Sequence, residues 1–227
     1  IKVLIFYIFY YLRKKYRSFY VNKKFNQTID DDKILFFPLQ TEPERSLLLA
    51  APYYTDQLEV IKKVSKSIPI NYKLYVKEHP TQIVRDWRKI SFYKQISNLP
   101  NVKLIHPSLS SKQIIEKSDG VVTIGGTVGF EAAFYGKPTL SFVKNIYSTL
   151  KSVITVGDVN ELSIMIQHML RLKVDSTDVS KFVANLEKNS FEFPMSELDI
   201  AATTEFFYGG FLVDTDVSSS QVKSYFN

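Results

Sequence analysis

Glycines, a threonine and a glutamate follow a short apolar run in the middle of the chain. Residues 120–124 are apolar or small, and Gly125, Gly126, Thr127 and Glu131 come after them. At a strand-to-helix turn, glycines let a ligand approach the backbone, and the first amides of the helix bind phosphate. We expect Thr127 to cap the helix and to donate its hydroxyl, and Glu131, one turn later, to accept hydrogen bonds from ribose hydroxyls. A tight turn with ordinary capping and a solvated Glu131 is the alternative.

Two of the three histidines directly precede a proline, which disfavours helix at the histidine and holds its imidazole in a defined loop. Lys77 and His79 are two residues apart, on the same side of an extended chain. Both are therefore candidates to contact a phosphate or to stabilise a departing one. His106, with Ser108, is a further candidate to face the same cleft and bind substrate. A structural loop histidine is the alternative at either position, and His79 ranks first because a Lys-Glu pair precedes it.

Polar side chains also follow the first apolar run, Ile34–Leu39. Gln40 and Glu42 are interpreted as ligands of a sugar or a phosphate at the same cleft edge. Ordinary turn chemistry with a local pair between Glu44 and Arg45 is the alternative.

The elements that must position these residues alternate along the chain. Short apolar or alternating runs predict strands at 34–39, 72–76, 102–105, 120–124 and 139–142. Apolar residues at helical spacing predict helices at 55–66, 84–97, 110–117, 127–135, 159–172, 179–188 and 197–207. Such alternation predicts a Rossmann-like α/β fold, a parallel sheet with helices on both faces. Because ligands bind beyond the carboxyl ends of parallel strands, we expect the loops above to converge on one anion.

Composition narrows the classes of function. The chain has 227 residues, 45% of them hydrophobic, so it is long and apolar enough to bury a sizeable core. The absence of cysteine excludes disulfides, thiolate nucleophiles and cysteine-based metal sites, and suits a reducing compartment. Seven of the 29 Lys and Arg residues lie in residues 1–29, which contain no acid, and the rest of the chain is about neutral. A nucleic-acid partner is therefore not expected. The acidic run Asp30–Asp32 is interpreted as a solvated linker, and no metal or cofactor site is expected.

Residues 1–29 are interpreted as a linker helix or a remnant of a preceding domain, followed by the main domain at 30–208 and a polar tail at 209–227. The segment is apolar and aromatic up to Leu12 and then basic. Its apolar run is shorter than the roughly 20 residues of a membrane span. We favour a helix that packs on a preceding domain; contact with an anionic membrane surface is the alternative. The first residue is Ile1 rather than Met, no signal peptide is visible, and an upstream domain is expected.

Five blocks of the sequence resemble, in order, the carboxyl-terminal half of capsule polysaccharide biosynthesis glycosyltransferases. They are FFPLQTEPERS, YYTDQLEVIKKVSKSIP, YKLYVKEHPTQ, NVKLIHPS and TIGGTVGFEAAFYGKP, between Ile34 and Tyr147. The histidine–proline element and the glycine turn with its glutamate are also similar to those of bacterial Kdo- and sialic-acid transferases, which use CMP-sugars.

The resemblance implies the second, donor-binding domain of a GT-B fold, which has two Rossmann-like domains. It implies that Lys77 and His79 meet the donor phosphate, that Gly126 and Thr127 support it, that Glu131 binds the ribose, and that no metal is needed. The predicted function is transfer of a sugar, with CMP-Kdo favoured over a UDP-sugar, to a growing capsular or surface polysaccharide or a lipid-linked glycan. We expect a cytoplasmic protein, peripheral on the inner face of the cytoplasmic membrane if the first helix contacts lipid. The acceptor domain, which usually carries the general base, is missing here, and no base is assigned.

Three alternatives remain open at this point. A polyol-phosphate transferase of the teichoic-acid type resembles this sequence in using histidine–proline loops with CDP-glycerol. A non-hydrolysing UDP-sugar epimerase shares the fold and a comparable glycine-turn-glutamate pattern. A non-catalytic module that binds nucleotide sugar or scaffolds capsule assembly would bind the donor without turnover.

Overall fold

The computed structural model describes residues 2–42, 46–85 and 87–190. The chain forms two compact units, residues 1–179 and 180–227. The sheet and the candidate site belong to the first unit. Of the second unit, the structure describes residues 180–190, which include the end of α8 (Ser176–Lys188).

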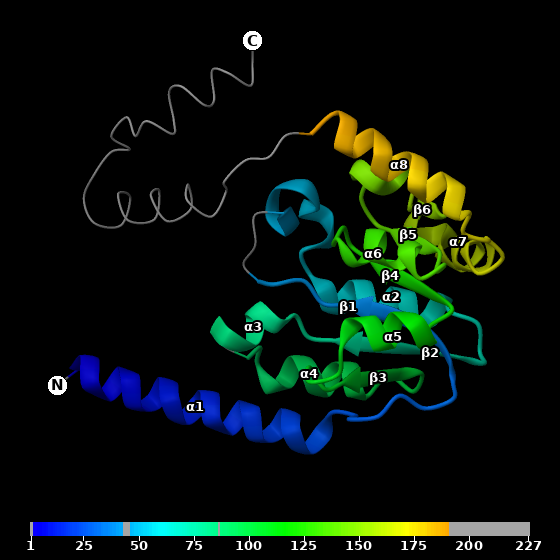
Figure 1. Ribbon diagram of the computed structural model, residues 1–227. Helices are drawn as coiled ribbons and strands as arrows, with labels where there is room; N and C mark the ends of the chain where they lie inside the picture. Colours follow the sequence, from blue (N-terminus) through cyan, green and yellow to red (C-terminus); the bar gives the residue numbers. More distant parts are fainter. Residues whose placement is uncertain (1, 43–45, 86, 191–227) are drawn as a thin grey trace, which may run out of the picture. The chain divides into compact units, whose positions relative to one another are not determined.

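Six parallel strands form one sheet in the order β3-β2-β1-β4-β5-β6 (Figure 1). They are β1 (Lys33–Pro38), β2 (Tyr72–Lys77), β3 (Val102–Ile105), β4 (Gly120–Thr123), β5 (Thr139–Ser141) and β6 (Val153–Thr155). The chain builds outward from β1 to β3, returns to the other side of β1, and continues from β4 to β6. Strand order therefore reverses between β1 and β4, and such a switch point is where open α/β sheets bind ligands. The predicted Rossmann-like fold is confirmed.

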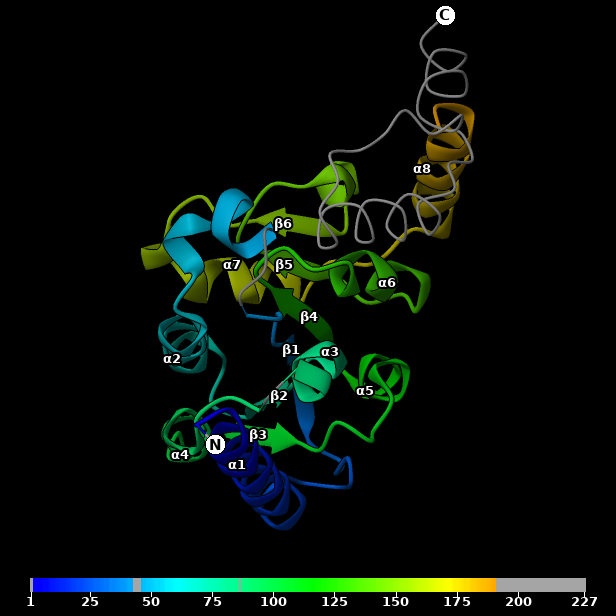
Figure 2. The same ribbon diagram turned by 90° about the vertical axis from the view of Figure 1, so that its left-hand side faces the viewer.

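Helices cover both faces of this sheet (Figure 2). The α-helices of the first unit are α1 (Lys2–Lys24), α2 (Gln57–Ser67), α3 (Pro80–Arg85), α4 (Ile90–Ser97), α5 (Ser111–Lys117), α6 (Val128–Phe134) and α7 (Leu162–Met169). Short helical turns add η1 (Ser46–Ala50), η2 (Pro52–Tyr54), η3 (Ile146–Thr149) and η4 (Val159–Glu161). Helices α2, α4 and α7 pack on one face, and α5 and α6 pack on the other. Strand β1 is buried on both sides, with Leu35 and Phe37 in one core and Ile34 and Phe36 in the other.

All five predicted strands are present, each within one residue of its predicted bounds. The sequence analysis missed β6, a three-residue edge strand whose side chains are only half-buried and carry little pattern. It also predicted one helix at 84–97, and this is wrong. The chain is not helical at Trp87 and Lys89, between α3 and α4. Asp56 caps α2 by accepting hydrogen bonds from the backbone amides of Leu58 and Glu59. The helix predicted at 197–207 and the tail boundary at 209 lie outside the described residues.

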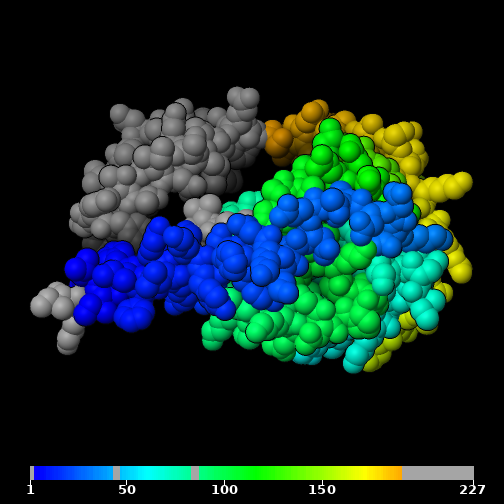
Figure 3. Space-filling view, turned by 90° about the horizontal axis from the view of Figure 1, so that it is seen from below, coloured from blue at the N-terminus to red at the C-terminus, as the bar shows by residue number. Residues whose placement is uncertain are grey.

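Helix α1 is joined to the rest of its unit at its carboxyl end. Val21 and Phe25 are buried in the larger core, and the backbone of Asn26 bonds to edge strand β3. Figure 3 shows α1, in dark blue, lying along the face that is viewed from below. Within the described ranges, no helix has the length and apolar character to cross a bilayer.

Candidate functional site

A pocket of about 230 Å³ opens at the switch point, beyond the carboxyl ends of β1 and β4. It is lined by Pro38, Leu39, Gln40, His79, Thr123, Gly125, Gly126, Thr127 and Val128. The structure thus brings together the loop after β1, the histidine–proline loop after β2 and the glycine turn after β4. This convergence is what strand alternation predicted from the sequence.

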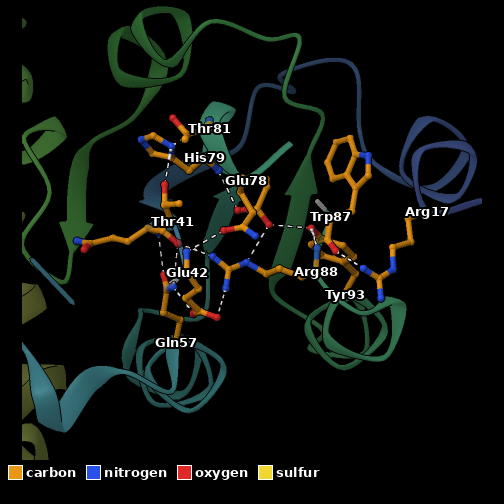
Figure 4. Close-up of polar contacts among 12 residues, drawn as sticks. Arg17, Thr41, Glu42, Gln57, Glu78, His79, Thr81, Trp87, Arg88 and Tyr93 are labelled. Carbon is orange, nitrogen blue, oxygen red and sulfur yellow. Dashed lines mark hydrogen bonds and ion pairs between the residues drawn. The ribbon is translucent and has the colours of Figure 1, made fainter. Parts of the chain in front are cut away.

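The imidazole of His79 is held through its Nδ1 atom (Figure 4). The backbone N–H of Thr81 donates to Nδ1 at 3.2 Å, and the Thr41 hydroxyl lies 3.0 Å from the same atom. A backbone N–H can only donate, so Nδ1 is an acceptor and the proton of the neutral ring sits on Nε2. Nε2 has no hydrogen-bond partner among the described residues. His79 therefore offers an N–H donor to a ligand in the pocket.

The glycine turn is occupied by a neighbouring side chain. With its amide oxygen toward the turn, Gln40 accepts hydrogen bonds from the N–H groups of Gly125 at 3.0 Å and Gly126 at 2.9 Å. Its backbone is fixed, because its N–H donates to the Gln57 side chain at 2.8 Å and its carbonyl accepts from the same amide at 2.9 Å. Gln40 thus presents one polar oxygen to two amides of the kind that bind an anion.

Thr127 and Glu131 form the outer rim of the turn. The prediction that the Thr127 side chain caps α6 is wrong. The Thr127 backbone is already helical, and its hydroxyl donates to the Glu131 carboxylate at 3.3 Å. The N–H groups of Thr127 and Val128 have no acceptor within the described part of the chain. Both the free N–H groups and the exposed Glu131 carboxylate therefore remain available to a ligand. Gly136 ends the helix with a φ of 68°, as predicted for a C′ glycine.

The turn is supported from behind by Tyr147, which the sequence analysis did not identify. Its hydroxyl donates to the Gly126 carbonyl at 2.6 Å, and burial raises its pKa, so it remains a donor at neutral pH. Close approach requires Gly129, where an added Cβ would lie 2.7 Å from the Tyr147 hydroxyl and 2.9 Å from Thr139. The Thr139 hydroxyl also donates to the Gly129 carbonyl at 2.9 Å.

A buried charge network lies beneath the loops that carry Gln40 and His79 (Figure 4). Arg88 is its centre: Nε donates to Glu78 at 2.9 Å, and another nitrogen lies 2.5 Å from Glu42. Glu78, which is 1% exposed, also accepts from the His79 backbone N–H at 2.9 Å and from Tyr93 at 2.7 Å. Arg88 therefore links the β1 loop, the β2 loop and the α3–α4 connection.

Within this network, Arg88 stays positively charged and the Tyr93 hydroxyl stays protonated. Burial alone would lower the pKa of Arg88, but Glu78 and then Glu42 hold it above the usual range. Burial, followed by the Glu78 charge, raises the pKa of Tyr93, which stays a donor. The carboxylate of Glu42 also accepts from Gln57. Glu42 is not among the residues that line the pocket, and its carboxylate is engaged with Arg88 and Gln57. The local pair between Glu44 and Arg45, given above as the alternative, falls outside the described residues.

Lys77 is not brought into the pocket. It shares a face of β2 with Tyr75, toward α5, and its ammonium donates to the Ser111 hydroxyl at 2.9 Å. Burial lowers the pKa of Lys77. Lys77 is therefore engaged with α5 and is not among the residues that line the pocket, and its contact with a donor phosphate beside His79 stays a prediction.

His106 and Ser108 are also not brought to the pocket. They follow β3, the edge strand two positions from β1. His106 Nδ1 lies 2.7 Å from the Ser108 hydroxyl and accepts from the Ser108 N–H, and Nε2 lies 2.9 Å from the Asn22 side chain of α1. Burial lowers the pKa of His106. The alternative of a structural loop histidine fits these contacts.

The acidic run before β1 is partly ordered by ion pairs. Lys103 lies 2.7 Å from Asp30 and 2.5 Å from Asp32, and Tyr75 donates to Asp32 at 3.2 Å. These contacts hold the pKa of Asp32 below its usual value, chiefly through Lys103. Across the residues that the structure describes, no group of three or more His, Cys, Asp or Glu side chains is placed to hold a metal ion.

Several solved structures are similar in fold. UDP-GlcNAc 2-epimerase from Methanocaldococcus jannaschii matches with 17% identity and a TM-score of 0.46, over 77% of this chain and 50% of that one. The KpsC beta Kdo 2,7 transferase of Thermosulfurimonas dismutans matches with 20% identity and a TM-score of 0.44, over 78% of this chain and 62% of that one. The chain therefore spans about half to three-fifths of the length of these proteins.

No curated protein matches the sequence. The profile of the family described as "Capsule polysaccharide biosynthesis protein" matches residues 7–151, which include every residue that lines the pocket. The match covers more than half of the chain. The chain belongs to the capsule polysaccharide biosynthesis protein family.

Proposed function

We propose that this chain is the donor-binding half of a GT-B glycosyltransferase that transfers a sugar from a nucleotide sugar to a capsular or surface polysaccharide. Membership of a capsule biosynthesis family supports the biological setting. The observation that carries the proposal is the pocket at the switch point, where an imidazole N–H, a hydroxyl and backbone N–H groups line one cavity. All of these are hydrogen-bond donors, so the pocket suits a phosphate oxygen.

Each residue has a part in this proposal. The His79 Nε2–H donates to the phosphate that leaves with the nucleotide, and the Thr127 N–H supports the same charge. Stabilising that charge as the bond to the sugar breaks is the contribution of this domain to catalysis. The Glu131 carboxylate, at the rim, accepts hydrogen bonds from the ribose hydroxyls. CMP-Kdo is the preferred donor because of the resemblance to CMP-sugar transferases, and the general base belongs to the acceptor domain.

Isothermal titration of CMP, UDP and CDP against the purified chain tests the site. We expect one nucleotide to bind, with CMP the strongest, and His79→Ala to weaken it roughly tenfold or more through loss of a charge-assisted contact. His168→Ala, which removes an exposed histidine of α7, is the matched control and leaves affinity unchanged.

The tautomer of His79 makes the test sharper. A glutamine amide nitrogen can take the place of Nε2, whereas an asparagine nitrogen reaches only as far as Nδ1. His79→Gln should therefore keep more affinity than His79→Asn. Equal weak binding of all three nucleotides, unaffected by His79→Ala or Glu131→Ala, would refute the assignment. Turnover with CDP-glycerol, or binding without turnover when the acceptor domain is supplied, would favour the alternative functions.

A further inference from the structure

The first turns of α1 expose apolar side chains in every direction. Each residue from Val3 to Phe9 is apolar or aromatic, and the exposed fractions lie between 46% and 68%. Successive helical residues point about 100° apart, so seven in a row leave no polar side. Surfaces of this kind are not normally left in water. A flat protein face would cover one side of this segment and leave the others exposed.

A band of positive charge follows directly along the same helix. Arg13, Lys14, Lys15 and Arg17 lie in the next turns, and residues 1–29 contain no acidic side chain. The Arg13 guanidinium lies 5.5 Å from the centre of the Tyr10 ring, at the boundary between the two zones. Apolar residues, then an aromatic boundary, then cations is the order in which hydrocarbon, interface and anionic headgroups are met in a membrane.

The basic half of α1 is fixed to the domain. Arg17 donates to the Trp87 carbonyl at 2.6 Å, and Asn22 bonds to His106 at 2.9 Å. The apolar half extends away from the sheet and its helices (Figures 1 and 3). Because α1 is attached rigidly at this end, a change in the position of the helix would also move the domain. His106 has a structural role in this attachment through its contact with Asn22.

We propose that α1 inserts its apolar first half into an anionic membrane surface, with the basic band at the level of the lipid phosphates. Residues 3–12 rise about 15 Å as a helix, which is half of a hydrocarbon core of about 30 Å. An apolar segment surrounded on all sides by lipid, with anions beside its cations, satisfies both observations together. This inference is independent of the proposed function.

Co-sedimentation of the full chain with vesicles tests the proposal. We expect binding to vesicles of phosphatidylcholine with about one third phosphatidylglycerol to be roughly tenfold tighter or more than to phosphatidylcholine alone, and to weaken with salt. Lys14→Glu/Lys15→Glu should lose most of this preference. Phe6→Ser/Phe9→Ser should weaken binding to both kinds of vesicle.

The controls are matched in chemistry and exposure. Lys63→Glu/Lys66→Glu changes the same charge on the exposed side of α2, and Tyr53→Ser/Ile70→Ser removes two exposed apolar side chains elsewhere. Neither should alter binding, and circular dichroism should show all four variants folded. The proposal fails if the chain does not bind vesicles, if neutral and anionic vesicles bind equally, or if the controls lose as much. It also fails if the apolar surface instead drives concentration-dependent self-association that Phe6→Ser/Phe9→Ser abolishes.

Discussion

At the scale of single residues, the amide of Gln40 occupies the position that an anion would take. Its oxygen accepts from the N–H groups of Gly125 and Gly126, and it does so in a pocket that also holds His79. A neutral amide oxygen is a weaker acceptor for these donors than a phosphate oxygen. We therefore expect a phosphate to compete with the Gln40 amide for these two N–H groups, whereas a fixed negative charge at this position would oppose phosphate binding.

Replacing Gln40 by glutamate tests this relationship. The Gln40→Glu carboxylate has nearly the same shape, and one of its oxygens accepts from the same two amides. The other oxygen replaces an amide nitrogen that faces acceptors, so we expect a loss of about 1–3 kcal/mol in the free energy of unfolding. Nucleotide affinity should fall roughly tenfold or more, because a carboxylate next to a phosphate is repulsive in a partly enclosed pocket. Calorimetry and urea unfolding measure the two quantities. Gln167→Glu, at an exposed position of α7, is the control, and equal losses in both variants would contradict the prediction.

The residue types next to each position in the sequence predicted part of the candidate site. His79, Gly126 and Thr127 were recognisable because proline and glycine restrict or free the backbone at their own positions. Gln40 was predicted to bind a ligand, but its bond to the glycine turn was not, since it joins residues 85 positions or more apart in the sequence. The contact of Lys77 with Ser111 was not predicted, because alternation along a strand does not show which residues of a later element a side chain will meet.

At the scale of elements, Arg88 holds three connections in register. It lies between the buried Glu78 and the half-buried Glu42, and its backbone N–H also donates to Tyr93 at 3.3 Å. The Arg17 guanidinium donates a hydrogen bond to the backbone carbonyl of Trp87, the residue before Arg88. These contacts use backbone groups that a continuous helix would pair internally, which explains why the helix predicted at 84–97 is interrupted. Nothing in the local periodicity of that segment signals a contact with residues 17, 42 and 78.

Removing the guanidinium should be costly. Arg88→Met leaves Glu78 buried without its counter-charge, so we expect a loss of about 3–5 kcal/mol in the free energy of unfolding, measured by urea denaturation. Adding Glu78→Gln should recover part of this loss, because the buried charge is then gone. Arg171→Met, at an exposed position, should cost less than about 0.5 kcal/mol. A loss at Arg88 no larger than at Arg171 would show that the network does not hold the loops.

The glycine turn depends on the space at Gly129. In Gly129→Ala the new methyl would lie 2.7 Å from the Tyr147 hydroxyl, so either Tyr147 or α6 must move. We expect a loss of about 1–3 kcal/mol in stability, and weaker nucleotide binding because Tyr147 anchors the Gly126 carbonyl. Gly157→Ala is the matched control, since its nearest atom would be 3.9 Å away. Thermal unfolding and calorimetry compare the two, and similar behaviour of both variants would contradict this account of the turn.

At the scale of the whole molecule, the pocket lies between two halves of one sheet. Strands β1 and β2 position Gln40 and His79, whereas β4 and β5 position the glycine turn and its support. The β1–β4 pair that joins the halves is short, with two registered residue pairs against six in β1–β2. A ligand that contacts both loops would therefore bridge the strand pair with the fewest registered residue pairs in the sheet.

Ligand binding should therefore be visible as global stabilisation. At a nucleotide concentration about 100 times its dissociation constant, a ligand of the native state alone adds about 2.7 kcal/mol. For a chain of this size that corresponds to a rise of roughly 5–10 °C in Tm. Hydrogen exchange should slow together at residues 78–82 and 125–128, since the same ligand contacts both loops. His79→Ala should reduce the rise in Tm by about half or more at the same nucleotide concentration, because a site that binds tenfold more weakly adds only about 1.4 kcal/mol. His168→Ala should preserve the full rise. If protection appeared at the glycine turn alone, the ligand would contact only one half of the sheet, and His79 would have no part in the site.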